Sequence, residues 1–137
     1  MTVTDLRVAD LMTIDPITVP VDASIEEAEE LLRRFHISGL PVTDGDGRLV
    51  GVISQTDLLR ARAAEDLWDQ WPGLTARHLM TSPALTATVR TSVYEAVTRL
   101  EAHHVHRLVI VDDDGTTPIG VISTTDLVRA MAARTDR

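Results

Sequence analysis

Apolar side chains recur with helical spacing in two stretches of the chain. Between residues 25 and 35 they occur at every third or fourth position for about three turns, and residues 93–100 keep the same period. A serine precedes each stretch and a glutamate follows that serine by three positions, a pairing that satisfies free N–H groups at a helix start. The pattern therefore predicts two amphipathic helices, capped by Ser24 and Ser92.

Apolar runs with a strand-like pattern follow both predicted helices. Within each half, two runs are separated by a segment rich in Asp and Gly, at 44–47 and at 112–115, which is typical of a β-hairpin turn. The hairpin strands are predicted at 39–43, 49–53, 108–111 and 119–122.

Shorter elements complete each half. A short opening helix that stops before a proline is predicted twice, and an extended piece follows it each time. These elements are predicted at 8–12, 17–19, 76–80 and 84–86. A last helix begins near Thr56 and again near Thr125. The order helix, strand, helix, strand, strand, helix predicts a mixed α/β or α+β fold.

The two halves repeat one sequence. Residues 51–58 read Gly-Val-Ile-Ser-Gln-Thr-Asp-Leu, and residues 120–127 read Gly-Val-Ile-Ser-Thr-Thr-Asp-Leu. A shared core explains the repeated Val and Ile, but packing does not require the polar set Ser-x-Thr-Asp. We therefore predict two copies of one unit, at 5–70 and 71–134, with the function where the copies meet. Either copy alone would be marginal in size, so the copies should pack together.

Composition narrows the function classes. The chain of 137 residues has a net charge of −8, its bases are all arginine, and it contains no cysteine. Disulfides, thiolate chemistry and lysine-dependent chemistry are therefore excluded. The acidic balance argues against a nucleic-acid surface, and no apolar run approaches the roughly 18 residues of a membrane span. With no signal-peptide pattern at the start, a soluble cytoplasmic protein is expected.

The repeated segments, the hairpins before them and the Leu-Met pairs at 11–12 and 79–80 together resemble a tandem pair of cystathionine β-synthase (CBS) domains, a Bateman module. The resemblance covers residues 5–134. It implies two β-α-β-β-α repeats packed around a pseudo-twofold axis, with clefts that often hold adenosine nucleotides. It brings no catalytic or DNA-binding element, so the expected protein is not an enzyme.

Asp57 and Asp126 are the candidates for ribose recognition. A ribose diol presents two O–H donors, and a carboxylate is an acceptor with two oxygens, as in dinucleotide-binding folds. Both aspartates stand at a predicted strand-to-helix junction. The alternative is that each aspartate only stabilises its helix start, an effect of roughly 0.3–1 kcal/mol.

Phosphate needs donors and positive potential, and a helix N-terminus supplies both. In the CBS family, the Ser or Thr three residues before the aspartate and the Thr directly before it contact the nucleotide. The matching candidates here are Ser54, Thr56, Ser123 and Thr125. In the first copy, Thr18, Ser38, Leu40 and Pro41 complete the nucleotide-binding candidates.

The copies differ just before their first hairpin strand. Residues 105–109 read Val-His-Arg-Leu-Val and resemble a stretch of the γ subunit of AMP-activated protein kinase, whose His and Arg meet AMP phosphates. Arg107 would supply a bidentate fork to phosphate and His106 a donor, whereas the first copy has Ser38 and Gly39. This difference predicts one dominant site and one weaker or empty site, without assigning the basic pair to either aspartate. The alternative for Arg107 is a solvated residue at a strand start.

Two further groups of residues stand out in the sequence, three histidines and two tryptophans. His103, His104 and His106 have no fourth ligand at a suitable spacing, so no metal site is predicted. Trp68 and Trp71 continue the helical stripe that begins at residue 58. They either pack in the core or contribute to a homodimer interface, since the family commonly dimerises through these helices.

The leading prediction is a ligand-sensing module that binds an adenosine-containing nucleotide between the repeats and passes a change of shape to a regulated partner protein. AMP, ADP and ATP are the favoured ligands, with S-adenosylmethionine and NAD left open and no permanent cofactor expected. One alternative is a dimerisation or interaction protein with degenerate clefts. A small enzyme is the third reading, but the chain shows no acid–base pair beyond the two aspartates.

Overall fold

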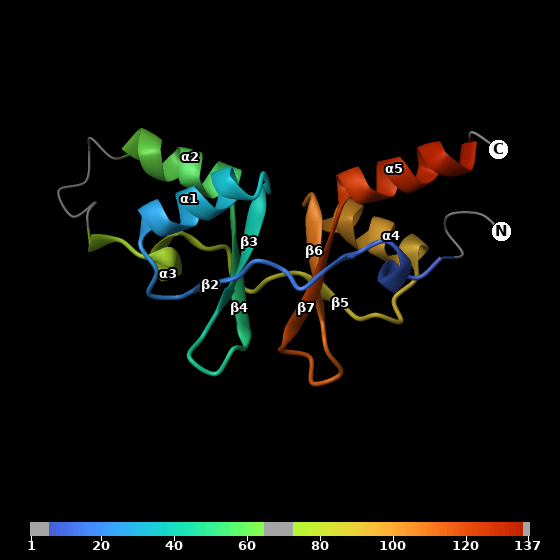
Figure 1. The fold of residues 1–137 in the computed structure, drawn as a ribbon, viewed down its shortest axis with the longest axis horizontal. Coiled ribbons are helices and arrows are strands. Elements are labelled where there is room, and N and C mark those ends of the chain that lie inside the picture. Colours follow the sequence, from blue (N-terminus) through green and yellow to red (C-terminus); the bar gives the residue numbers. More distant parts are fainter. Residues whose placement is uncertain (1–5, 65–72, 136–137) are drawn as a thin grey trace. The chain divides into compact units, whose positions relative to one another are not determined.

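A computed structural model describes residues 6–64 and 73–135, with side chains as far as Ala132. The chain divides into two compact units. We call Ile17–Ala84 the central unit, and Met1–Pro16 together with Leu85–Arg137 the terminal unit. Each unit combines helices with a small sheet, as the mixed fold class predicts (Figure 1).

The elements of the central unit are β2 (Val19–Pro20), α1 (Ile25–Arg34), β3 (Gly39–Thr43), β4 (Leu49–Ser54), α2 (Gln55–Ala64) and α3 (Ala76–Leu79). Its sheet has the strand order β2-β3-β4, in which β2 is parallel to β3 and β3 is antiparallel to β4. Helices α1 and α2 contact each other and pack on β3 and β4, respectively (Figure 1). The buried core lies between these helices and the sheet, and includes Ile25, Leu40 and Ile53.

The elements of the terminal unit are the 3₁₀ helix η2 (Val8–Asp10), β1 (Thr13–Ile14), β5 (Thr86–Ala87), α4 (Val93–His103), β6 (Arg107–Val111), β7 (Pro118–Ser123) and α5 (Thr124–Thr135). Its sheet has the order β1-β7-β6-β5, with β6 and β7 forming the second hairpin. The core is the counterpart of the central one and includes Val93, Leu108 and Ile122.

The predicted helix caps and hairpins are confirmed. Ser24 Oγ accepts from Glu27 N and Ser92 Oγ accepts from Glu95 N, each at 3.1 Å. Helices α1 and α4 begin directly after these serines. The hairpins β3–β4 and β6–β7 lie where the apolar runs placed them.

Several smaller elements differ from the prediction by a few residues. The last helices begin at Gln55 and Thr124, one position earlier than predicted. Strand β1, at Thr13–Ile14, was not predicted, because its two residues are exposed and pair only with the distant strand β7. The stripe through Trp68 and Trp71 lies outside the described residues.

The opening segments are exchanged between the sequence repeats. Helix α3 begins the second repeat but packs in the central unit, where Ala76 N donates to Ala23 O at 2.9 Å. In the terminal unit, Val8 N donates to Thr91 O at 2.9 Å, so the first repeat's opening helix packs on the second repeat. The compact units therefore differ from the sequence repeats 5–70 and 71–134, because each unit includes the opening segment of the other repeat.

Two repeated glycines explain how the exchanged segments come so close. A Cβ added to Gly51 would lie 2.7 Å from Met80 Sδ and 2.8 Å from Thr81 O. A Cβ on Gly120 would lie 2.7 Å from Met12 Sδ. These contacts are shorter than a real Cβ allows, and at Gly51 one of the close atoms is backbone, so the first hairpin needs glycine where the opening segment crosses it.

Candidate functional site

The strand-to-helix junction of the central unit lies between β4 and α2. Ser54 N and Ser54 Oγ donate to Asp57 Oδ2, at 2.8 and 3.0 Å, and Asp57 N donates to Ser54 Oγ at 3.2 Å. The other oxygen, Oδ1, accepts from Thr81 Oγ1 at 3.4 Å and lies 3.9 Å from Arg60 Nη1. The side chain of Asp57 is only 9% exposed, and these bonds offset the cost of burying a carboxylate.

The terminal unit repeats this arrangement between β7 and α5. Ser123 N and Ser123 Oγ donate to Asp126 Oδ2, at 2.8 and 3.0 Å, and Asp126 N donates to Ser123 Oγ at 3.2 Å. Neither serine bond uses Asp126 Oδ1, and the residue is half-buried.

The reciprocal bonds show that both aspartates hold a helix start. The serine is the N-cap and the aspartate returns a bond to the serine N–H, which satisfies two of the free donors at the helix N-terminus. The helix-start alternative is therefore correct as a description of the structure. It leaves room for a ligand role, because the serines engage only Oδ2 and each carboxylate oxygen has two lone pairs, so Oδ1 of Asp57 can accept a further bond beside that from Thr81.

The predicted hydroxyl candidates lie at the same junctions. Thr56 and Thr125 are exposed in the first turns of α2 and α5. Ser38 is exposed at the start of β3, and its carbonyl accepts from Gln55 N at 3.0 Å, which fixes it beside the start of α2. The structure thus brings Ser38, Ser54, Thr56 and Asp57 together within the central unit.

The basic pair lies in the same compact unit as Asp126. Strand β6 begins at Arg107, which stands opposite Ser123 on β7. The carbonyl of His106 accepts from Thr124 N at 2.9 Å and from Thr124 Oγ1 at 3.1 Å. Strand pairing therefore places His106 and Arg107 beside the start of α5, a placement that sequence spacing alone left open.

Three candidates from the first copy, Thr18, Leu40 and Pro41, are buried or half-buried. Leu40 is fully buried in the central core, and Pro41 next to it is also buried. Their side chains serve packing, so a ligand could reach only their backbone. Thr18 is half-buried and immediately precedes β2.

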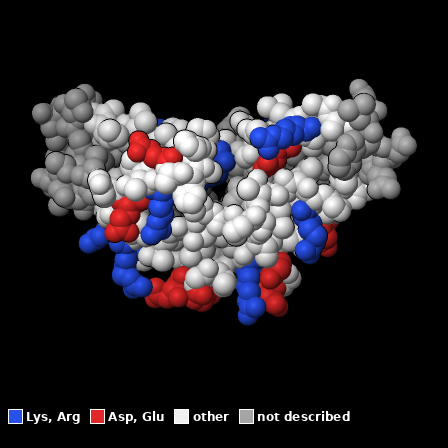
Figure 2. All heavy atoms as spheres, turned by 180° about the vertical axis from the view of Figure 1, so that it is seen from behind, with Lys and Arg blue, Asp and Glu red and all other residues white. Residues whose placement is uncertain are grey.

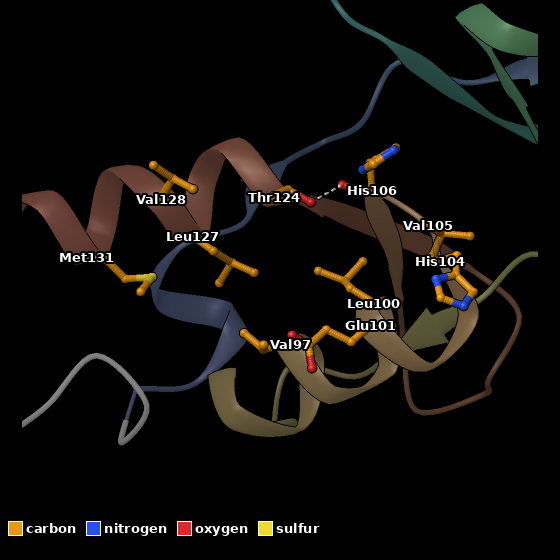
Figure 3. Close-up of a pocket in the computed structure, with 10 residues that line it drawn as sticks. All are labelled: Val97, Leu100, Glu101, His104, Val105, His106, Thr124, Leu127, Val128 and Met131. Atoms are coloured by element: carbon orange, nitrogen blue, oxygen red, sulfur yellow. Dashed lines mark hydrogen bonds between the residues drawn. The ribbon is translucent and has the colours of Figure 1, made fainter.

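An open groove that the sequence did not predict lies between α4 and α5. It has a volume of about 730 Å³ and lies wholly within the terminal unit. Leu100 on α4 and Leu127 on α5 point toward one another inside it, while His106 and Thr124 lie at one end (Figure 3). One sequence feature points to this groove: Val97 and Met131 are apolar at the positions where the first repeat has the charged residues Glu29 and Arg62.

The histidines have local structural roles. His36 and His104 follow the last turns of α1 and α4 and both adopt the left-handed backbone conformation, with φ of 52° and 53°. Both residues therefore end a helix in the conformation that closes its last turn. His78 is exposed, and its Nδ1 accepts from Thr75 N at 2.9 Å, which caps α3. Within residues 6–64 and 73–135, no group of three His, Cys, Asp or Glu could hold a metal ion.

Charged side chains of both signs lie on one face of the molecule (Figure 2). On the face drawn in Figure 2, acidic and basic groups are interspersed rather than gathered into one basic stripe. In the turn of the second hairpin, the Thr117 hydroxyl and the Thr116 and Thr117 N–H groups lower the pKa of Asp114 to about 2. Among the described helices, none is both long and apolar enough to cross a membrane.

Residues 8–64 and 76–133 each match the family model of the CBS domain. The chain belongs to the CBS domain family. The predicted resemblance is therefore confirmed, and each matched CBS region contains one of the two serine–aspartate junctions.

Relatives with a curated function contain the CBS pair as a small part of a longer chain. The inosine-5′-monophosphate dehydrogenase of Bifidobacterium longum is 35% identical over 119 residues. The match covers 86% of this chain and 21% of the dehydrogenase, so the chain spans about a fifth of that relative's length.

Solved CBS pairs match over nearly their full length. CBSX2 from Arabidopsis thaliana is 31% identical with a TM-score of 0.81, covering 98% of this chain and 99% of that one. CBSX2 has also been solved in complex with AMP, and that structure matches at 33% identity and a TM-score of 0.81, over 96% and 99% of the two chains. The CBS domain pair of protein MJ0100, in complex with 5′-methylthioadenosine and S-adenosyl-L-methionine, is 26% identical with a TM-score of 0.83, over 93% and 97%.

Proposed function

We propose that this CBS pair is a regulatory module that senses an adenosine-containing ligand, with AMP, ADP or ATP favoured. The observation that carries the proposal is the duplicated junction, in which a serine orients an aspartate at a helix start. The structures of CBSX2 with AMP and of MJ0100 with two adenosyl compounds support the ligand class.

The chemistry of the junction suits such a ligand. The ribose diol would donate to the aspartate, whose orientation the serine has already set. The phosphate would meet the hydroxyl of Thr56 or Thr125 and the positive end of the helix dipole. In the terminal unit, His106 and Arg107 would add donors and charge, so binding there should favour phosphorylated ligands.

A role in binding rather than catalysis is part of the proposal. The similarity to the dehydrogenase covers about a fifth of that enzyme, and what is shared is the CBS region. We propose that the module acts on a regulated partner protein.

The second candidate is a constitutive interaction or dimerisation protein without a working nucleotide site. The bonds that stabilise the helix starts favour this candidate, because that structural role alone can account for an aspartate at both positions. A homodimer is predicted under either reading.

Calorimetric titration with AMP, ADP, ATP, S-adenosylmethionine and NAD tests the proposal. At least one ligand should bind the parent protein, and Asp57→Asn combined with Asp126→Asn should lose roughly 1–3 kcal/mol of binding free energy, since each change replaces a charged acceptor oxygen by an NH2 group. Asp46→Asn, in the exposed β3–β4 turn, is the matched control and should bind as the parent does.

Two results separate the candidates. A ligand at about 100 times its dissociation constant adds about 2.7 kcal/mol to the free energy of unfolding, enough to raise the Tm by several degrees. If no ligand in the panel shifts the Tm or gives heat, the nucleotide role is wrong and the interaction role stands. Equal affinity for ribose and 2′-deoxyribose ligands would show that the aspartates do not bind the ribose diol, while leaving nucleotide binding itself in place.

A further inference from the structure

The two strand-to-helix junctions differ at the second oxygen of their aspartates. We call the junction at Asp57 the central junction and that at Asp126 the terminal junction. We propose that Thr81 is a specificity-determining residue of the central junction: its hydroxyl occupies one acceptor position of Asp57, so that this carboxylate accepts a single ribose hydroxyl, whereas Asp126 accepts both. The inference rests on the proposed function, since it states which adenosine ligands each junction distinguishes.

Most acceptor positions of Asp57 are already occupied by the protein. A carboxylate offers about four lone pairs, two on each oxygen. Oδ2 accepts from both Ser54 N and Ser54 Oγ, at 2.8 and 3.0 Å. Oδ1 accepts from Thr81 Oγ1 at 3.4 Å, while Arg60 Nη1, at 3.9 Å, is beyond hydrogen-bond distance. These three bonds leave Asp57 one open position, on Oδ1, for a ligand.

Asp126 keeps a second open position. Ser123 N and Ser123 Oγ donate to its Oδ2, as Ser54 does at the central junction. Thr13 is the counterpart of Thr81, because each follows the methionine of an opening segment and pairs with a hairpin strand. Within the part of the chain that the structure describes, however, no hydrogen bond joins Thr13 to Asp126. Both lone pairs of Asp126 Oδ1 are therefore open to the two hydroxyls of a ribose.

Backbone pairing holds Thr81 beside Asp57. Thr81 N donates to Val52 O at 2.9 Å, and Val52 N donates to Thr81 O at 3.0 Å. The next residue, Ser82, donates from Oγ to Val50 O at 2.7 Å. The opening segment of the second repeat is thus attached to β4 just before the junction, so the Thr81 hydroxyl stays within reach of Oδ1.

The number of open positions determines which ribose hydroxyls matter. At the terminal junction, removing either the 2′ or the 3′ hydroxyl removes a bond to Asp126. At the central junction, only one of the two hydroxyls can bond to Asp57, so removal of the other should have little effect. A lost hydrogen bond to a charged acceptor weakens binding by about tenfold or more.

Calorimetry with AMP, 2′-deoxy-AMP and 3′-deoxy-AMP tests the proposal. The variant Asp126→Asn isolates the central junction, and Asp57→Asn isolates the terminal one. At the terminal junction, both deoxy forms should bind about tenfold or more weakly than AMP. At the central junction, only one of the two deoxy forms should lose affinity, and the other should bind as AMP does.

Replacing Thr81 should change this pattern. In the Asp126→Asn background, Thr81→Val keeps the shape of the side chain but frees the second position on Oδ1, so both deoxy forms should then bind more weakly than AMP. Thr81→Ser keeps the hydroxyl and should keep the original pattern. Thr13→Val in the Asp57→Asn background is the matched control and should change nothing. A purely structural Thr81 would alter the Tm in thermal unfolding but not the order of the three ligands.

Three outcomes would overturn the proposal while leaving the proposed function in place. The first is a central junction at which both deoxy forms, or neither, lose affinity, a result that does not depend on the folding of any Thr81 variant. The second is a folded Thr81→Val variant that still distinguishes only one deoxy form. The third is a central junction that does not bind AMP although the parent does. A parent that binds no ligand of the panel would instead refute the proposed function itself, and this inference with it.

Discussion

At each strand-to-helix junction, one serine hydroxyl serves two partners. Ser54 Oγ donates to the Asp57 carboxylate and accepts from the Asp57 N–H, and Ser123 does the same with Asp126. A ligand diol would therefore meet a carboxylate that is already oriented, which reduces the ordering cost of binding. The same bonds hold the helix start, so asparagine is a more informative replacement than alanine because it keeps the size of the side chain.

Gly51→Ala should destabilise the protein by about 1–3 kcal/mol, the usual cost of forcing an extra carbon into a packed site. The new Cβ would lie 2.8 Å from the carbonyl oxygen of Thr81, and backbone cannot move aside as a side chain can. Urea unfolding measures the change. Gly45→Ala is the control, since nothing lies within 4 Å of its added Cβ. Equal stability of the two variants would show that the crossing segment tolerates a side chain.

Among the secondary-structure elements, paired strands determine what surrounds each helix start. The register of β6 with β7 places Arg107 opposite Ser123, while the register of β3 with β4 places Gly39 opposite Ser54. The two junctions therefore share the serine and aspartate but differ in the neighbouring strand. This difference supports the prediction that the two sites are not equivalent.

Arg107→Ala should weaken AMP or ATP binding much more than adenosine binding. A hydrogen bond to a charged group contributes roughly 1.5–3 kcal/mol, and adenosine has no phosphate with which to make it. Calorimetry with nucleotide and nucleoside measures the difference, and added salt should weaken the nucleotide more. Arg48→Ala, exposed in the first hairpin, controls for the loss of one positive charge. Two equal sites that Arg107→Ala leaves unchanged would contradict the prediction.

For the whole molecule, the exchange of opening segments decides which pieces of chain form a complete core. The buried residues of the central core and the partly buried ones packed against them all lie between Ile17 and Met80, and they include Ala76, Leu79 and Met80 from the second repeat. The repeat at 5–70 lacks these three residues but contains Val8, which is buried in the other core. The linker regions around residues 16 and 84 therefore carry the chain from one core to the other.

A fragment of residues 17–84 should keep more native structure than a fragment of residues 5–70, because only the first contains its whole core. Both fragments are small, so we expect 17–84 to be a marginally stable domain and 5–70 to be unfolded. Circular dichroism and urea titration compare the two. If the 5–70 fragment proves the more stable, the sequence repeat rather than the compact unit is the folding unit.

Local chemistry explains why much of the fold could be predicted. The Ser24 and Ser92 caps, the period of α1 and α4 and the Asp/Gly turns are determined by residues within a few positions of one another. The family could be recognised for the same reason, since its motif is a short segment that occurs twice. Of the candidate site, the sequence supplied the serines, the aspartates and the basic pair.

Contacts between distant residues decided the rest. Only the tertiary structure shows that Thr81 reaches Asp57 and that Leu40 is a core residue. Strand pairing, rather than spacing, puts Arg107 beside Ser123. The opening segments are exchanged, and an open groove lies between α4 and α5, because side chains far apart in sequence pack against each other. Sequence patterns report local backbone preference, whereas these features depend on long-range packing, which no single segment encodes.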